Sequence, residues 1–79
     1  MKIIFFAQSR LAAGCAETTL DLSQPLPPAQ LWDLLIEKFS GLAPLRRTAR
    51  LARRETYLAG DELLQPTDEI AVIPAVSGG

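Results

Sequence analysis

The sequence predicts an α+β domain in which a mixed sheet carries one helix on one of its faces. Two observations point to this class. The two most apolar strand-like segments, residues 2–7 and 69–73, stand near the two ends of the chain, and an amphipathic helical pattern lies between them. The chain has 79 residues, which is enough for one small domain.

The first predicted strand covers residues 2–7, where β-branched and aromatic residues follow one another. Ile3 and Phe5 fall on one face of this strand, and Ile4 and Phe6 fall on the other. A strand that is apolar on both faces is typical of the centre of a sheet.

A loop and a second strand are expected next. Residues 9–16 contain Gly14 and are expected to form the loop. Residues 17–22 alternate, with Thr18 and two leucines on one face and polar residues on the other. This pattern predicts a half-buried strand that pairs back onto the first one. Residues 23–28 include three prolines and break the chain before the helix.

The helix is expected to begin near Pro28, because a proline in the first turn loses no hydrogen bond that the helix would make. Apolar residues then recur with helical spacing, which predicts one buried stripe. The residues of this stripe are Leu31, Trp32, Leu34, Leu35, Ile36 and Phe39. Gly41 is expected to cap the C-terminal end of the helix.

The remaining part of the chain is predicted to form short strands separated by turns. Residues 42–49 have no clear period and leave room for a short helical turn. Pro74 lacks an N–H donor and should end the pairing of the last strand. The predicted strands of this part are residues 50–54, 56–59 and 69–73.

This order of elements predicts a ubiquitin-like β-grasp fold. The first and last strands would lie side by side and parallel at the centre of the sheet, with the helix packed on one face. We expect a β-grasp domain at residues 1–74 and a flexible tail at residues 75–79. A split ferredoxin-like sheet and a small open barrel are the alternative folds for the same pattern.

The composition excludes several classes of function. The chain has no histidine, which removes the usual general base and the commonest metal ligand. A net charge of −1 does not favour nucleic-acid binding. The longest apolar runs are far short of the roughly 20 residues that span a bilayer. A single cysteine, Cys15, and the lack of a signal-peptide pattern favour the cytoplasm. We therefore expect no self-sufficient enzyme, no bound cofactor or metal, and no membrane partner.

The most informative feature is the pair of glycines, Gly78 and Gly79, after the last strand. Glycine has no Cβ, so two of them can pass through a narrow slot and carry a terminal carboxylate into the active site of another protein. The alternative hypothesis is an ordinary frayed terminus.

Two stretches resemble the family of molybdopterin synthase small, sulfur-carrier subunits. Residues 3–10, followed by Gly14, are similar to the first strand and loop of that family, and residues 68–79 are similar to its C-terminal block. The middle of the chain agrees in pattern only. In place of the Val, Asn, Gly and Pro that the family usually has, this chain carries Arg53, Arg54, Thr67 and Ala75.

The resemblance implies that Gly79 is the residue that carries sulfur. A terminal carboxyl has a pKa of about 3.5 and is an unreactive carboxylate at neutral pH, so it must first be activated. The family implies a ubiquitin-activating-like adenylyltransferase that uses ATP, a sulfur donor protein, and a thiocarboxylate on Gly79. The sulfur would pass to cyclic pyranopterin monophosphate in the large subunit of molybdopterin synthase, a heterotetramer that holds the activity. This chain would be its non-catalytic subunit, with Gly78 in the narrow part of the tail.

The apolar second face of the central strands predicts a docking surface, because one helix can cover only one face of a sheet. By resemblance, the partner interface falls on Phe6, Tyr57, Ile73, Pro74, Val76 and Ser77. Two alternatives remain at this point: connecting segments could cover that face, or Phe5 could face outward and Phe6 inward.

Three further questions stay open from the sequence. The five arginines within residues 46–54 fit either a solvated surface or a patch that docks an acidic partner. Cys15 fits either a passive thiol or a sulfur relay. The chain could also be a sulfur carrier for thiamine or tRNA thiolation, or a ubiquitin-like binding module with an unmodified tail. The Phe5-Phe6-Ala7-Gln8 opening favours the molybdopterin branch.

Overall fold

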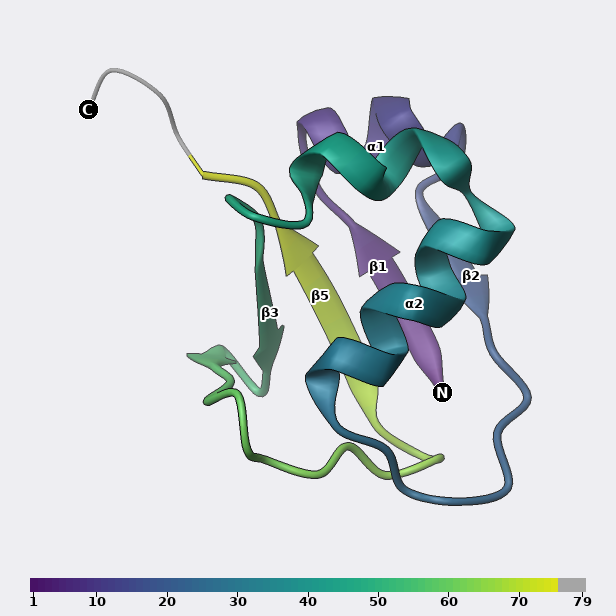
Figure 1. Cartoon of the computed structure of the whole chain (residues 1–79), viewed down its shortest axis with the longest axis vertical. Coiled ribbons are helices and arrows are strands. Elements are labelled where there is room, and N and C mark those ends of the chain that lie inside the picture. The colour runs from purple at the N-terminus through teal and green to yellow at the C-terminus, as the bar shows by residue number, and fades with distance from the viewer. Residues whose placement is uncertain (76–79) are drawn as a thin grey trace.

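A five-stranded mixed sheet organises the chain, and the computed structural model describes it for residues 1–75 (Figure 1). The strand order is β2-β1-β5-β3-β4. The strands are β1 (Lys2–Phe5), β2 (Glu17–Thr19), β3 (Arg50–Arg53), β4 (Thr56–Tyr57) and β5 (Glu69–Ile73). The β-grasp prediction is confirmed. The predicted tail lies almost wholly outside the described residues and stays a prediction.

The first and last strands pair in parallel at the centre of the sheet. Ile3 is opposite Ile70, and Phe5 is opposite Val72. All four side chains are at most 2% exposed, because this face of the sheet turns toward the helices. On the far side of β5, β3 runs antiparallel, with Leu51 opposite Val72.

The helix α2 (Pro28–Lys38) crosses the sheet over β1 and β5 (Figure 1). Pro28 lies in its first turn, as predicted. Leu31 and Leu35 are fully buried and Trp32 is 7% exposed, so the predicted stripe packs on the sheet. The prediction that Leu34 belongs to this buried stripe is wrong, because its side chain is 36% exposed and lies at the edge of the packed face.

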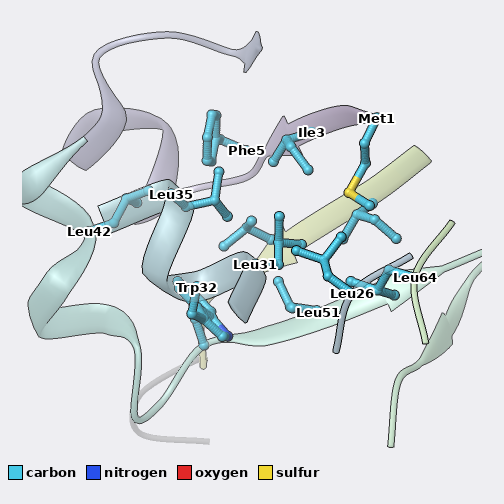
Figure 2. Packing of buried hydrophobic residues seen from close by; sticks show 13 residues of the cluster. Met1, Ile3, Phe5, Leu26, Leu31, Trp32, Leu35, Leu42, Leu51 and Leu64 are labelled. Carbon is cyan, nitrogen blue, oxygen red and sulfur yellow. The ribbon is translucent and has the colours of Figure 1, made fainter. Parts of the chain in front are cut away.

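One hydrophobic core fills the space between the sheet and α2 (Figure 2). Phe5 lies above Leu35 in this core, and its ring meets that of Phe39 edge to face, with 5.5 Å between centroids. Burial of one such side chain contributes roughly 1.5–3 kcal/mol. Met1 also belongs to the core, and its terminal ammonium donates a 2.7 Å hydrogen bond to the carbonyl of Leu20.

The segment after β1 is a helix, and the loop prediction for residues 9–16 is wrong for residues 9–13. α1 spans Gln8–Ala13 and ends at Gly14, whose φ of 78° is left-handed. The Gly14 N–H donates to the carbonyl of Arg10, which closes the last turn. Gly14 is therefore the C-cap of a short helix, where a left-handed residue is common.

The end of α2 also differs from the prediction. Its cap is Phe39, whose N–H donates to the carbonyl of Leu35 at 2.7 Å, and Gly41 instead lies inside the 3₁₀ helix η1 (Ser40–Leu45). This helix occupies part of the segment left open at residues 42–49. The predicted strands at residues 2–7, 17–22, 50–54 and 56–59 are each shorter in the structure.

Gly41 is required by a close approach of η1 to α1. A Cβ at this position would lie 2.6 Å from the carbonyl oxygen of Ala12, a backbone atom that cannot rotate away. We expect Gly41→Ala to lower the free energy of unfolding by about 1–3 kcal/mol, the usual cost of overpacking. Urea unfolding followed by circular dichroism measures it. Gly60→Ala is the matched control, because no heavy atom lies within 4 Å of its Cβ position. Equal stability of the two variants would contradict the contact.

Candidate functional site

The face of the sheet opposite α2 carries an apolar hollow of about 300 Å³. Its floor is a row of residues from three neighbouring strands, in which Ala71 of β5 lies between Ile4 of β1 and Ala52 of β3. The two alanines are small, so the larger side chains around them form walls. The lining residues are Ile4, Phe6, Ala52, Arg54, Glu55, Glu69, Ala71 and Ile73.

The alternation along β1 decides which face each phenylalanine occupies. Phe5 is 2% exposed and packs in the core, whereas Phe6 is 49% exposed and lines the hollow. The alternative in which Phe5 faces outward is therefore wrong. Ile4 and Ile73 are only half-buried, so no connecting segment within residues 1–75 covers this face. The apolar second face of the central strands is open.

The residues predicted for the partner interface are only partly brought together. Phe6 and Ile73 line the same hollow. Tyr57 is 49% exposed on the outer strand β4, opposite Ala52, and the guanidinium of Arg50 lies 4.1 Å from its ring centroid. Pro74 is buried in this structure, so its side chain is not accessible to a partner. The other predicted residues, Val76, Ser77, Gly78 and Gly79, lie outside the described residues.

Ser9, which the sequence analysis did not single out, joins the ends of the two central strands. Its side chain is fully buried, and its hydroxyl lies 2.6 Å from the carbonyl oxygen of Phe6 and 3.2 Å from that of Val72. A hydroxyl has one proton, so it donates to the nearer Phe6 oxygen. The N–H of Phe6 also donates to Val72 at 3.2 Å. The start of the terminal segment after β5 is thereby held beside Phe6.

The arginines within residues 46–54 do not form one patch. Arg46 donates to the carboxylate of Asp33 at 2.7 Å, and Arg50 stacks on Tyr57. Arg53 binds two carboxylates, Glu62 at 3.0 Å and Asp68 at 2.8 Å. Three of the five arginines therefore have partners within the described chain, which weakens the docking-patch hypothesis. No local pattern predicts these pairs, because the partners lie 7 to 15 residues away in the chain.

Arg53, which stands where the family usually has Val, pairs with Asp68 at the turn before β5. The Asp68 carboxylate accepts hydrogen bonds from Arg53 and from the N–H of Gln65, both at 2.8 Å. Partial burial alone would raise the pKa of Asp68, but the Gln65 N–H and the Arg53 guanidinium outweigh it and lower the pKa below its usual value. The ionised carboxylate therefore stabilises the turn that leads into β5.

This pair predicts a pH-dependent contribution to stability. A lowered folded-state pKa contributes stability above the unfolded-state pKa of about 3.9, and the contribution disappears as pH falls through the lower folded-state value. We expect Asp68→Asn to be clearly less stable than the parent chain at pH 7. The difference between the two should shrink below about pH 4. Urea unfolding from pH 7 to pH 3 measures it, and a difference that stays constant over this range would contradict the assignment.

The remaining candidates, the thiol of Cys15 and a cluster of metal ligands, form no recognisable binding site in the part of the chain that the structure describes. Cys15 is a free, half-buried thiol that packs against the core, and no described residue pairs with it. No three Asp, Glu, Cys or His side chains of residues 1–75 are grouped to hold a metal ion. Among the same residues, no helix has the length and apolar character to cross a membrane.

Comparison with known proteins assigns the family. The model of the ThiS family matches residues 3–79. The molybdopterin synthase sulfur carrier subunit of Homo sapiens is 39% identical over all of this chain and 93% of its own length, and that of Arabidopsis thaliana is 33% identical over all of this chain and 82% of its own. Among solved structures, SAMP1 from Haloferax volcanii has the same fold, with a TM-score of 0.82, 22% identity and coverage of 99% and 97% of the two chains. The chain therefore belongs to the ThiS family, and its full-length similarity to molybdopterin synthase sulfur carrier subunits confirms the predicted resemblance.

Proposed function

We propose that this protein is the sulfur-carrier subunit of a molybdopterin synthase and that Gly79 carries the sulfur. The observation that carries the proposal is the place where the terminal segment begins. β5 ends at Ile73, beside Phe6 and at the wall of the apolar hollow. A partner docked on the hollow would therefore lie next to the segment that leads to Gly79. The full-length similarity to sulfur carrier subunits supports the same function.

The chemistry begins with activation of the terminal carboxylate. A carboxylate oxygen of Gly79 attacks the α-phosphorus of ATP in an adenylyltransferase, pyrophosphate leaves, and an acyl adenylate forms. A hydrosulfide equivalent from a sulfur donor protein then displaces AMP and leaves a thiocarboxylate. The carrier itself binds no cofactor in this scheme, because ATP belongs to the activating enzyme.

The large subunit would use the thiocarboxylate as a nucleophile. The carrier docks through its hollow, and the large subunit binds the segment that ends in Gly78 and Gly79. Holding the sulfur beside cyclic pyranopterin monophosphate turns a bimolecular attack into one with fixed orientation, which accelerates it. Two carriers, each bearing a thiocarboxylate, supply the two sulfurs of the dithiolene. The acid, base and phosphate-binding groups come from the large subunit. We place the assembly, a heterotetramer, in the cytoplasm.

Intact-mass spectrometry tests the proposal. The protein is incubated with ATP, an adenylyltransferase and a sulfur donor, and the C-terminal peptide should gain the mass difference between sulfur and oxygen at Gly79. The charged protein, mixed with the large subunit and cyclic pyranopterin monophosphate, should then form molybdopterin. A reaction without ATP is the control and should leave the mass unchanged.

Two results would contradict the proposal in different ways. An unchanged mass in the complete reaction would indicate a binding module whose terminus is not modified. A charged protein that sulfurates a thiazole precursor or a tRNA, but not the pterin, would indicate a carrier of another pathway.

A further inference from the structure

Two of the three non-glycine residues of the described chain that have a positive φ line the hollow. Ala7 has a φ of 50° and directly follows Phe6, and Arg54 and Glu55 have φ values of 53° and 65° and line the hollow themselves. Side chains with a Cβ rarely adopt this region, because the Cβ crowds the neighbouring carbonyl. Such strain concentrates at functional sites, where the rest of the structure holds it in place.

Arg54 and Glu55 are the two central residues of the hairpin between β3 and β4. Arg53 is paired directly with Thr56, so the turn has only two residues. Two successive positive φ values correspond to a type I′ turn, which favours Asn-Gly because these residues tolerate the conformation best. The turn geometry therefore does not favour Arg or Glu at these two positions.

Neither of these two side chains has a direct polar partner among the described residues, although the charge of Arg54 helps to lower the pKa of Asp68. Both residues are exposed, and within residues 1–75 neither side chain makes a hydrogen bond or an ion pair. Their neighbour Arg53, in contrast, is held by Glu62 and Asp68. Glu69, the third charged residue that lines the hollow, is likewise exposed and unpaired among the described residues.

The lining of the hollow therefore combines an apolar floor with two carboxylates and one guanidinium. An apolar side chain fits over Ala52 and Ala71, and a basic group beside it would meet the carboxylates of Glu55 and Glu69. An acidic group on the partner would meet Arg54. Charges at the edge of an interface select the partner and speed its association more than they add affinity.

We propose that the strained Arg54–Glu55 turn is a specificity element, which selects a partner that carries an apolar side chain flanked by a basic one. The inference rests on the proposed function, because it takes the hollow as the docking site of the large subunit. An Asn-Gly turn would be less strained, but it would lack the charges of Arg54 and Glu55 that the proposed selection needs.

The decisive variant is the double substitution Arg54→Asn and Glu55→Gly. It gives the turn its preferred residues, so we expect the melting temperature to rise by about 5 °C. At low salt, the same variant should bind the large subunit about tenfold more weakly, because Glu55 no longer meets the basic group of the partner and Arg54 no longer meets an acidic one, and its affinity should depend less on salt. A fold defect cannot explain weaker binding by a more stable protein.

Two single substitutions separate the effect of a charge on binding from the effect of the turn conformation on stability. Glu55→Gln removes a charge from the turn and keeps a side chain there, so it should weaken binding without raising the melting temperature. Glu37→Gln is the matched control, because Glu37 is exposed on α2, away from the hollow, and it should bind like the parent chain.

Phe6→Ala distinguishes failure of this inference from failure of the proposed function. If Phe6→Ala weakens binding while the turn variants bind like the parent chain, the specificity role is wrong and the docking site stands. If Phe6→Ala also binds normally, the hollow is not the docking site. The specificity role of the turn and the proposed docking of the large subunit are then both wrong.

Discussion

A chain that lacks Gly79 should lose sulfur transfer to the pterin by at least about a hundredfold, because displacement of a reacting group by even 1 Å can cost that much. Removing one residue shortens the reach of the segment by up to about 3.5 Å. The new terminus would be Gly78, which an adenylyltransferase built for one more residue would present poorly. Single-turnover formation of molybdopterin, with the extent of charging read by intact mass, measures the two steps separately.

The shortened chain should otherwise behave as the parent chain. Its core, its sheet and the hollow belong to residues 1–75, so the melting temperature should be nearly unchanged and the docking face should stay intact. Transfer at the parental rate by the chain without Gly79 would contradict the assignment of this residue. Loss of folding would show that the terminus has a structural role that this proposal does not contain.

Phe6→Ala should weaken binding of the large subunit about thirtyfold while the monomer stays folded. An aromatic anchor at an interface typically costs about 2 kcal/mol or more when it is truncated, which corresponds to this change in affinity. Phe6 is 49% exposed and lines the hollow, so its removal leaves no cavity in the core. Isothermal titration calorimetry with the large subunit, alongside thermal unfolding of the variant alone, gives both quantities.

Phe5→Ala is the matched control, because Phe5 is the adjacent residue on the opposite face. Its side chain is 2% exposed and contacts the ring of Phe39, so truncation should cost about 3–5 kcal/mol of stability. A small domain has only about 5–15 kcal/mol in total, so this variant should be severely destabilised. The reverse result, with Phe6→Ala unfolded and Phe5→Ala impaired only in binding, would contradict the site.

The sequence was sufficient to predict the centre of the sheet and the two apolar faces of its strands, because both depend on a period of two. The alternation separates Ile3 and Phe5 from Ile4 and Phe6, but only the structure shows that Ile3 and Phe5 enter the core and that the other face is open. The helix stripe was also predictable, except for Leu34 at its margin. Strong local patterns of this kind survive in the structure because burial of the apolar face stabilises them.

The elements that were missed have weaker local signals. Residues 8–13 contain good helix formers followed by Gly14, so a C-cap interpretation of that glycine was available in the sequence. A six-residue helix is too short to be stable alone and forms here because it packs against η1 and β1. The hydrogen bonds of Arg53 and Ser9 depend on residues distant in the chain, which no local pattern reveals.

The positive φ values at Ala7, Arg54 and Glu55 could not be predicted, because none of these residue types favours them. The register of the β3–β4 hairpin imposes the turn, and the turn imposes the conformation. The strained turn, which carries the proposed specificity role, was therefore visible only in the structure.

The pairing of Lys2 with Glu69 has a consequence for how the protein is made. The centre of the sheet joins the first strand of the chain to the last, so this contact cannot form until almost the whole chain has been synthesised. Contacts between such distant segments slow folding, because loop closure precedes the gain from packing. A growing chain on the ribosome has neither a complete sheet nor residue 79. Under the proposed function, Gly79 would therefore become available for sulfur transfer only after every strand of the sheet has been synthesised.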